Sequence, residues 1–111
     1  MESSKTIRPE ELASHLSGGQ SLLVIDLRKD PDYRTDPRLV PGAVKRNLAD
    51  IDAWSMTLPR NGEIVVYCQQ GESVGTAAVE WLQKHGIAAR QVEGGFSAWR
   101  AADLPLTRVM P

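Results

Sequence analysis

Apolar and polar positions along the chain follow two alternating patterns. Short, nearly continuous apolar runs predict strands at residues 21–27 and 64–67. Three shorter segments, residues 6–8, 43–44 and 89–92, are also predicted as strands. Between them, apolar residues recur every three or four positions, which predicts helices at residues 9–17, 47–58, 76–85 and 96–101. Strands separated by helices need crossover connections, so the pattern predicts an α/β fold with three α/β/α layers and a central parallel sheet. We find no repeat or linker, and predict a single domain over residues 1–111.

One segment, residues 30–41, interrupts this alternation. It contains three prolines and several charged residues. Proline removes a backbone donor and restricts the residue before it, so a dense group of prolines is typical of irregular structure. We predict a long surface loop here.

Composition and charge narrow the classes of function. The chain has 111 residues, of which 41% are hydrophobic, and a net charge of −1. A balanced charge gives no electrostatic hold on nucleic acid or on an anionic membrane. Apolar runs such as residues 22–25 are too short to span a bilayer, and residues 1–6 lack the apolar stretch of a secretory signal. We expect a cytoplasmic protein that has no nucleic-acid or membrane partner.

The single cysteine, Cys68, follows the apolar strand at residues 64–67 directly, and a short glycine-containing loop and a helix come after it. Ligands of parallel α/β sheets bind at the carboxyl ends of the strands. Backbone N–H groups of the loop and the dipole of the following helix favour an anion there, and therefore the reactive thiolate. A buried, inert cysteine is the structural alternative. The position at the end of a strand favours a working nucleophile.

The chain resembles a known protein family from Thr6 to Leu106, and five short motifs carry this resemblance. They occur in order, as Ile25-Asp26-Leu27-Arg28, Val40-Pro41-Gly42-Ala43, Val65-Val66-Tyr67-Cys68 with Gly71, Glu93-Gly94-Gly95-Phe96-Ser97-Ala98-Trp99, and Leu104-Pro105-Leu106. In these motifs the chain resembles a single-domain rhodanese, a family of sulfurtransferases.

The resemblance implies a rhodanese-like fold and a reaction through a Cys68 persulfide. Cys68 would take sulfane sulfur from a small donor such as thiosulfate and pass it to cyanide, a thiol or a protein acceptor, without a cofactor or metal. The substrate-binding loop would be the six residues after the nucleophile, namely Gln69, Gln70, Gly71, Glu72, Ser73 and Val74. With one cysteine in the chain, the acceptor must come from outside.

Two positions depart from the family pattern. The loop after Cys68 has no Lys or Arg and carries the acid Glu72, and Leu39 replaces the usual His. Repulsion between Glu72 and an anionic donor predicts slow turnover with thiosulfate, or a less negative donor such as a persulfide on a partner protein.

Other interpretations remain for the same residues. A tyrosine-phosphatase type of reaction needs an Arg at the sixth position after the Cys, and Val74 stands there. A non-catalytic rhodanese-like binding or redox-sensing module is the remaining alternative. Asp26 and Arg28 are expected to brace loops rather than react. Trp54 belongs either to the core or to the wall of the site.

Overall fold

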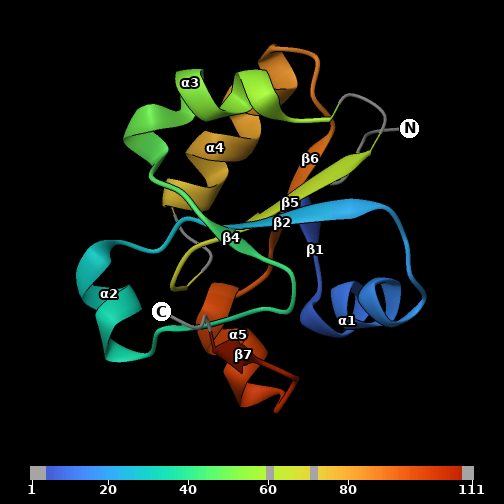
Figure 1. Ribbon diagram of the computed structural model, residues 1–111. Helices are drawn as coiled ribbons and strands as arrows, with labels where there is room; N and C mark the ends of the chain where they lie inside the picture. The colour runs from blue at the N-terminus through green and yellow to red at the C-terminus, as the bar shows by residue number, and fades with distance from the viewer. Residues whose placement is uncertain (1–4, 60–61, 71–72, 109–111) are drawn as a thin grey trace.

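A computed structural model describes residues 5–59, 62–70 and 73–108. Its centre is a sheet of five parallel strands in the order β1-β6-β5-β2-β4 (Figure 1). The strands are β1 (Thr6–Ile7), β6 (Ala89–Val92), β5 (Glu63–Tyr67), β2 (Leu22–Asp26) and β4 (Val44–Lys45). The predicted parallel sheet is therefore confirmed.

Helices cover both faces of this sheet (Figure 1). Helices α3 (Ile51–Trp54) and α4 (Ser73–Lys84) lie on one face, and α1 (Pro9–Ser17) and α5 (Gly95–Ala101) lie on the other. Leu82 and Trp54 pack with Ile64 in the first of the two cores. Trp99 and Phe96 pack in the second core, which contains Leu12 and Val65. The central strands β2 and β5 are apolar on both sides because they separate the two cores.

Two segments differ from the sequence-based expectation. The predicted loop at residues 30–41 contains a helix, α2 (Asp30–Thr35), and a strand, β3 (Arg38–Leu39), which pairs antiparallel with β7 (Thr107–Arg108). A proline lies at the start of α2, where its missing N–H would have no helical partner in any case. The predicted helix at residues 47–58 is instead three short turns, η1 (Leu48–Asp50), α3 and η2 (Ser55–Thr57).

The buried pair Asp26–Arg28 connects the end of β2 to these segments. Arg28 Nε donates to Asp26 Oδ2 at 2.9 Å, and its terminal nitrogens donate to the carbonyls of Asp36 at 2.8 Å and Arg38 at 2.9 Å. The guanidinium also stacks over the Phe96 ring, 3.8 Å from the centroid. These contacts are the bracing role that the sequence predicted.

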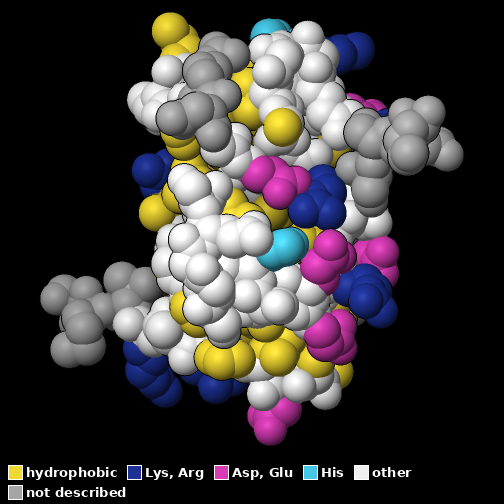
Figure 2. Space-filling view, turned by 90° about the vertical axis from the view of Figure 1, so that its right-hand side faces the viewer, with side chains coloured by type: hydrophobic (Ala, Val, Ile, Leu, Met, Phe, Trp, Pro, Cys, Tyr) yellow, Lys and Arg dark blue, Asp and Glu magenta, His cyan; other side chains and the backbone are white. Residues whose placement is uncertain are grey.

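The surface seen from the α1 side carries acidic and basic side chains next to one another (Figure 2). Arg90 illustrates this arrangement, since it pairs with Glu63 and approaches Glu11 at 4.0 Å. In the described residues no helix has the length and apolarity that crossing a membrane requires.

Candidate active site

Cys68 lies at the carboxyl end of β5, and its backbone is fixed from two sides. On one side, the strand it leaves is tied to β2, because Leu27 N donates to Tyr67 O at 2.7 Å. On the other side, Phe96 N donates to Cys68 O at 2.8 Å, and Ser97 N donates to Gln69 O at 2.9 Å. The first turn of α5 therefore holds the start of the loop. The Cys68 residue is only 6% exposed.

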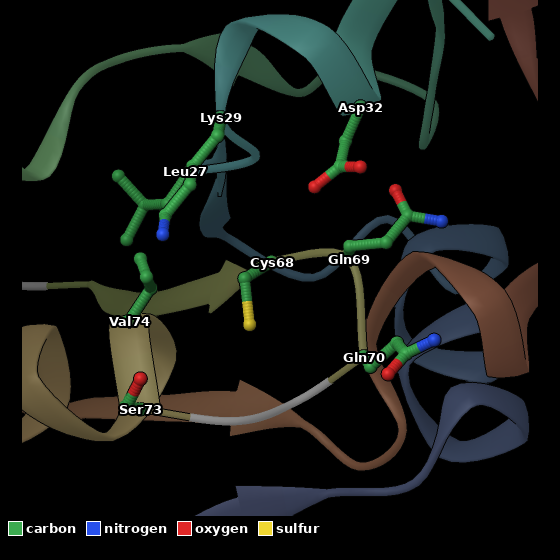
Figure 3. Close-up of a pocket in the computed structure, with 8 residues that line it drawn as sticks. All are labelled: Leu27, Lys29, Asp32, Cys68, Gln69, Gln70, Ser73 and Val74. Atoms are coloured by element: carbon green, nitrogen blue, oxygen red, sulfur yellow. The ribbon is translucent and has the colours of Figure 1, made fainter. Parts of the chain in front are cut away.

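A pocket of about 320 Å³ opens beside Cys68 (Figure 3). Its lining comes from the exit of β2, the start of α2, the end of β5 and the start of α4, and comprises Leu27, Lys29, Asp32, Cys68, Gln69, Gln70, Ser73 and Val74. Figure 3 shows the Cys68 sulfur directed toward the loop side, with Lys29 and Asp32 on the opposite side of the pocket. Cys68, the loop that follows it and α2 thus meet in one place.

The structure brings most of the predicted site residues together. Gln69, Gln70, Ser73 and Val74 line the same pocket as Cys68. Gly71 and Glu72, which were also predicted to bind substrate, lie outside the described residues. Ser73 and Val74 form the beginning of α4, so the positive end of this helix lies at the pocket.

Two pocket residues, Lys29 and Asp32, were not predicted from the sequence. The sequence motifs pointed only to the loop after Cys68, whereas these two residues follow β2 and belong to the start of α2. The signal that could have found them is the pairing of β2 with β5, because neighbouring parallel strands end at the same edge of the sheet. The pocket therefore holds a cation that the loop itself lacks.

Two further side chains, Trp54 and Tyr67, have structural roles. Trp54 is 7% exposed, and its indole N–H donates to Asn47 O at 2.8 Å. Trp54 is absent from the described lining of the Cys68 pocket, so the core interpretation holds. The Tyr67 hydroxyl accepts a hydrogen bond from Val40 N at 3.2 Å. Burial and the nearby Asp26 carboxylate raise the pKa of Tyr67 above its usual value, so its phenol stays protonated.

The fold and the order of the motifs agree with a known family. A family model described as a rhodanese-like domain matches residues 8–102. The chain belongs to the rhodanese-like domain family. The predicted membership is confirmed.

Several named proteins are similar in sequence to this rhodanese-like domain. YtwF of Bacillus subtilis, provisionally named a sulfurtransferase, is 28% identical over 91% of this chain and 95% of its own length. A sulfurtransferase of Allochromatium vinosum is 23% identical over 90% of this chain and 92% of that protein. A tRNA 2-selenouridine synthase of Shewanella sp. is 39% identical over 62 residues, but these are 56% of this chain and 16% of the synthase.

Solved structures show the same architecture. A rhodanese-like domain protein from Staphylococcus aureus superposes with a TM-score of 0.75 at 28% identity, over 86% of this chain and 90% of that one. A protein from Lactobacillus plantarum superposes with a TM-score of 0.84 at 22% identity, over 94% of this chain and 88% of that one. The second likeness shows the fold alone.

Proposed function

We propose that this protein is a sulfurtransferase that carries sulfane sulfur as a persulfide on Cys68. The observation that carries the proposal is the position of the chain's single cysteine at the end of β5, in a pocket with the beginning of α4. In the first half-reaction the Cys68 thiolate attacks the outer sulfur of thiosulfate. A new S–S bond forms, the S–S bond of thiosulfate breaks, and sulfite leaves with the electron pair. In the second half-reaction an external nucleophile takes the sulfur.

The reaction needs fixed positive dipoles near the reacting sulfur, and the N-terminus of α4, which begins at Ser73 in the pocket, supplies one. Negative charge lies first on the thiolate and then on the terminal sulfur of the persulfide, and fixed N–H dipoles stabilise both without reorganising. The lining formed by the described residues contains no histidine, and the phenol of Tyr67 is hydrogen-bonded in the core. The proposed mechanism therefore uses a stabilised thiolate in place of a general base.

A thiosulfate:cyanide assay tests the proposal. Wild type should form thiocyanate and should gain the mass of one sulfur atom when it is treated with thiosulfate alone. Cys68→Ser should lose both properties, because a hydroxyl cannot hold the sulfur as a persulfide. Ser73→Ala is the matched control for loss of a polar group in the pocket, and it should retain measurable transfer. A Cys68→Ser variant with wild-type turnover would refute the proposal.

A second candidate function is a non-catalytic redox-sensing module. The low exposure of Cys68 and the acid Asp32 in its pocket favour this candidate, because both slow the approach of an anionic donor. A sensing cysteine reacts with an oxidant or with a thiol cap and does not turn over. If hydrogen peroxide modifies Cys68 readily while thiosulfate never adds sulfur to it, this second function is the correct one.

A further inference from the structure

Lys29 and Asp32 place opposite charges in the Cys68 pocket without pairing with each other. Both residues line the pocket. Among the described residues, neither lies within ion-pair distance of an opposite charge, although Asp36 and Arg38 nearby do pair, at 2.8 Å. Figure 3 shows the Lys29 amine on the side of Leu27 and Val74, and the Asp32 carboxylate on the side of Gln69. The pocket thus has a positive side and a negative side.

The negative side also has an unused hydrogen-bond acceptor. Gln69 Nε2 donates to Ser97 Oγ at 3.2 Å, and Gln69 Oε1 is buried with no donor in the described part of the chain. In Figure 3 this oxygen and the Asp32 carboxylate lie on the same side of the pocket. Two acceptors that have no donor among the described residues favour a group that brings several N–H donors and a positive charge, such as an ammonium ion.

We propose that the pocket binds a small zwitterionic amino thiol of the cysteine type as the sulfur acceptor. Lys29 binds the carboxylate, and Asp32 with the Gln69 carbonyl behind it binds the ammonium. The thiol extends toward the loop side, where the Cys68 sulfur points. This inference rests on the proposed sulfurtransferase function. In a cysteine the three groups lie on adjacent carbons, which suits a pocket of about 320 Å³.

The transfer step is balanced without any oxidant or reductant. The acceptor thiol loses its proton to solvent, and its thiolate attacks the outer sulfur of the Cys68 persulfide. A new S–S bond forms on the acceptor while the S–S bond to Cys68 breaks. The electron pair of the broken bond returns to Cys68 as a thiolate. The product is a persulfide of the amino thiol.

Four thiols that differ only in charged groups test this assignment on the persulfide-loaded full chain. They are L-cysteine, cysteamine (no carboxylate), 3-mercaptopropionate (no ammonium) and 2-mercaptoethanol (neither). Rates of sulfur transfer are compared per thiolate, since the thiols ionise differently. Lys29→Gln should lower the rate for cysteine relative to cysteamine by about fivefold, and Asp32→Asn should lower the rate for cysteine relative to 3-mercaptopropionate by a similar factor.

Matched controls carry the same charge changes away from the pocket. Lys84→Gln, at the end of α4, and Asp103→Asn, after α5, should leave all four relative rates unchanged. If Lys29→Gln and Asp32→Asn slow all four thiols equally, the charges do not select a zwitterion and the inference is wrong. A tripeptide thiol such as glutathione transferring faster than cysteine would also overturn it.

A binding measurement separates this inference from the proposed function. S-methyl-L-cysteine is a zwitterion that cannot accept sulfur, and it should protect Cys68 of wild type from iodoacetamide. Protection should weaken about fivefold in Lys29→Gln and in Asp32→Asn. Protection in a protein that forms no persulfide would refute the sulfurtransferase proposal and leave the zwitterion site standing. Persulfide formation without protection would refute only the zwitterion site.

Discussion

The segments beside the candidate site depend on one buried side chain, Arg28, for their position. It is 1% exposed, and its charge is balanced by Asp26. Its guanidinium donates to the backbone carbonyls of Asp36, just after α2, and of Arg38, in β3. A guanidinium is planar and has five donors in a fixed arrangement, whereas an ammonium is a point charge on a flexible stem. A lysine in place of Arg28 would therefore keep the positive charge but lose this arrangement of hydrogen bonds.

Arg28→Lys should lower the free energy of unfolding by about 3 kcal/mol, because it keeps a buried charge but loses hydrogen bonds and the stacking on Phe96. Urea denaturation followed by circular dichroism measures this loss. Arg38→Lys is the matched control, since Arg38 is partly exposed and pairs with Asp36 near the surface. The control should lose about 1 kcal/mol or less. Equal losses in the two variants would contradict the bracing role of Arg28.

Asp36 should make the free energy of unfolding depend on pH in the acid range. The hydrogen bond from the Arg38 side chain lowers the pKa of Asp36 from 3.8 to about 2. A carboxyl whose pKa is lower in the folded state stabilises the fold above its unfolded pKa, and this contribution is lost as the pH falls through the folded pKa. The difference in unfolding free energy between wild type and Asp36→Asn should therefore be largest above about pH 4 and shrink toward pH 2.

Acid titration of stability in Arg38→Gln provides the control for Asp36. Without the Arg38 guanidinium, the largest cause of the lowered Asp36 pKa is gone. The acid-dependent difference between Arg38→Gln and the double variant Arg38→Gln/Asp36→Asn should be smaller than that between wild type and Asp36→Asn. An unchanged difference would show that Arg38 does not set the ionisation of Asp36.

At the scale of elements, the short helix α5 positions the loop of the candidate site. Its first N–H groups bond to the carbonyls of Cys68 and Gln69, and Gly94 precedes the helix with φ of 72°. A Cβ at Gly94 would lie 2.5 Å from the Ala98 Cβ. The glycine is thus required both by the left-handed backbone and by the close approach of Ala98.

A comparison of Gly94→Ala with Gly86→Ala should separate the effect of the left-handed backbone from the effect of the close contact with Ala98. Gly86 has a similar φ of 77°, but a Cβ there would meet no atom within 4 Å beyond its chain neighbours, so Gly86→Ala should lose only about 1 kcal/mol. Gly94→Ala should lose about 3 kcal/mol, since it adds steric overlap to the same backbone strain. Thermal unfolding measures both losses. Equal losses would show that the contact with Ala98 is relieved by a small shift of α5.

The strands could be predicted from the sequence because their signal is local. Residues 21–27 and 64–67 are nearly continuously apolar, and the structure has strands β2 and β5 within one residue of both. Helix α2 was missed because three prolines in residues 30–41 indicated a loop, although a proline at the start of a helix is compatible with it. Strand β3 was missed because its partner β7 lies almost seventy residues later in the chain.

At the scale of the whole molecule, the sheet order assembles the candidate site. Strands β2 and β5 are separated by about forty residues in sequence, yet they pair from Leu22–Glu63 to Asp26–Tyr67. Their carboxyl ends therefore lie side by side, and this places Lys29 and Asp32 in the same pocket as Cys68. The position of Cys68 at the end of a strand could be predicted because its signal is local. The charges that face it depend on the topology, which the sequence pattern did not specify.

The last prediction concerns which sulfur donor the protein uses, and it depends on the charge of Glu72. Glu72 lies outside the described residues, and the sequence predicts that its charge faces the incoming donor. Repulsion scales with donor charge, so it should disfavour thiosulfate more than a singly charged persulfide. Glu72→Gln should raise kcat/KM for thiosulfate several-fold, and Glu72→Lys should raise it further. Both gains should shrink as salt is added, because exposed charges are screened.

Steady-state kinetics at low and high salt test this prediction, with Glu80→Gln as the matched control. Glu80 lies on α4 and approaches Lys5 at 3.7 Å, and it does not belong to the described lining of the Cys68 pocket. Its neutralisation should leave kcat/KM for thiosulfate unchanged. If Glu72→Lys has no effect at low salt, Glu72 does not face the donor. The two described charges of the pocket, Lys29 and Asp32, would then determine how an anionic donor approaches Cys68. Sulfur transfer through Cys68 would remain intact.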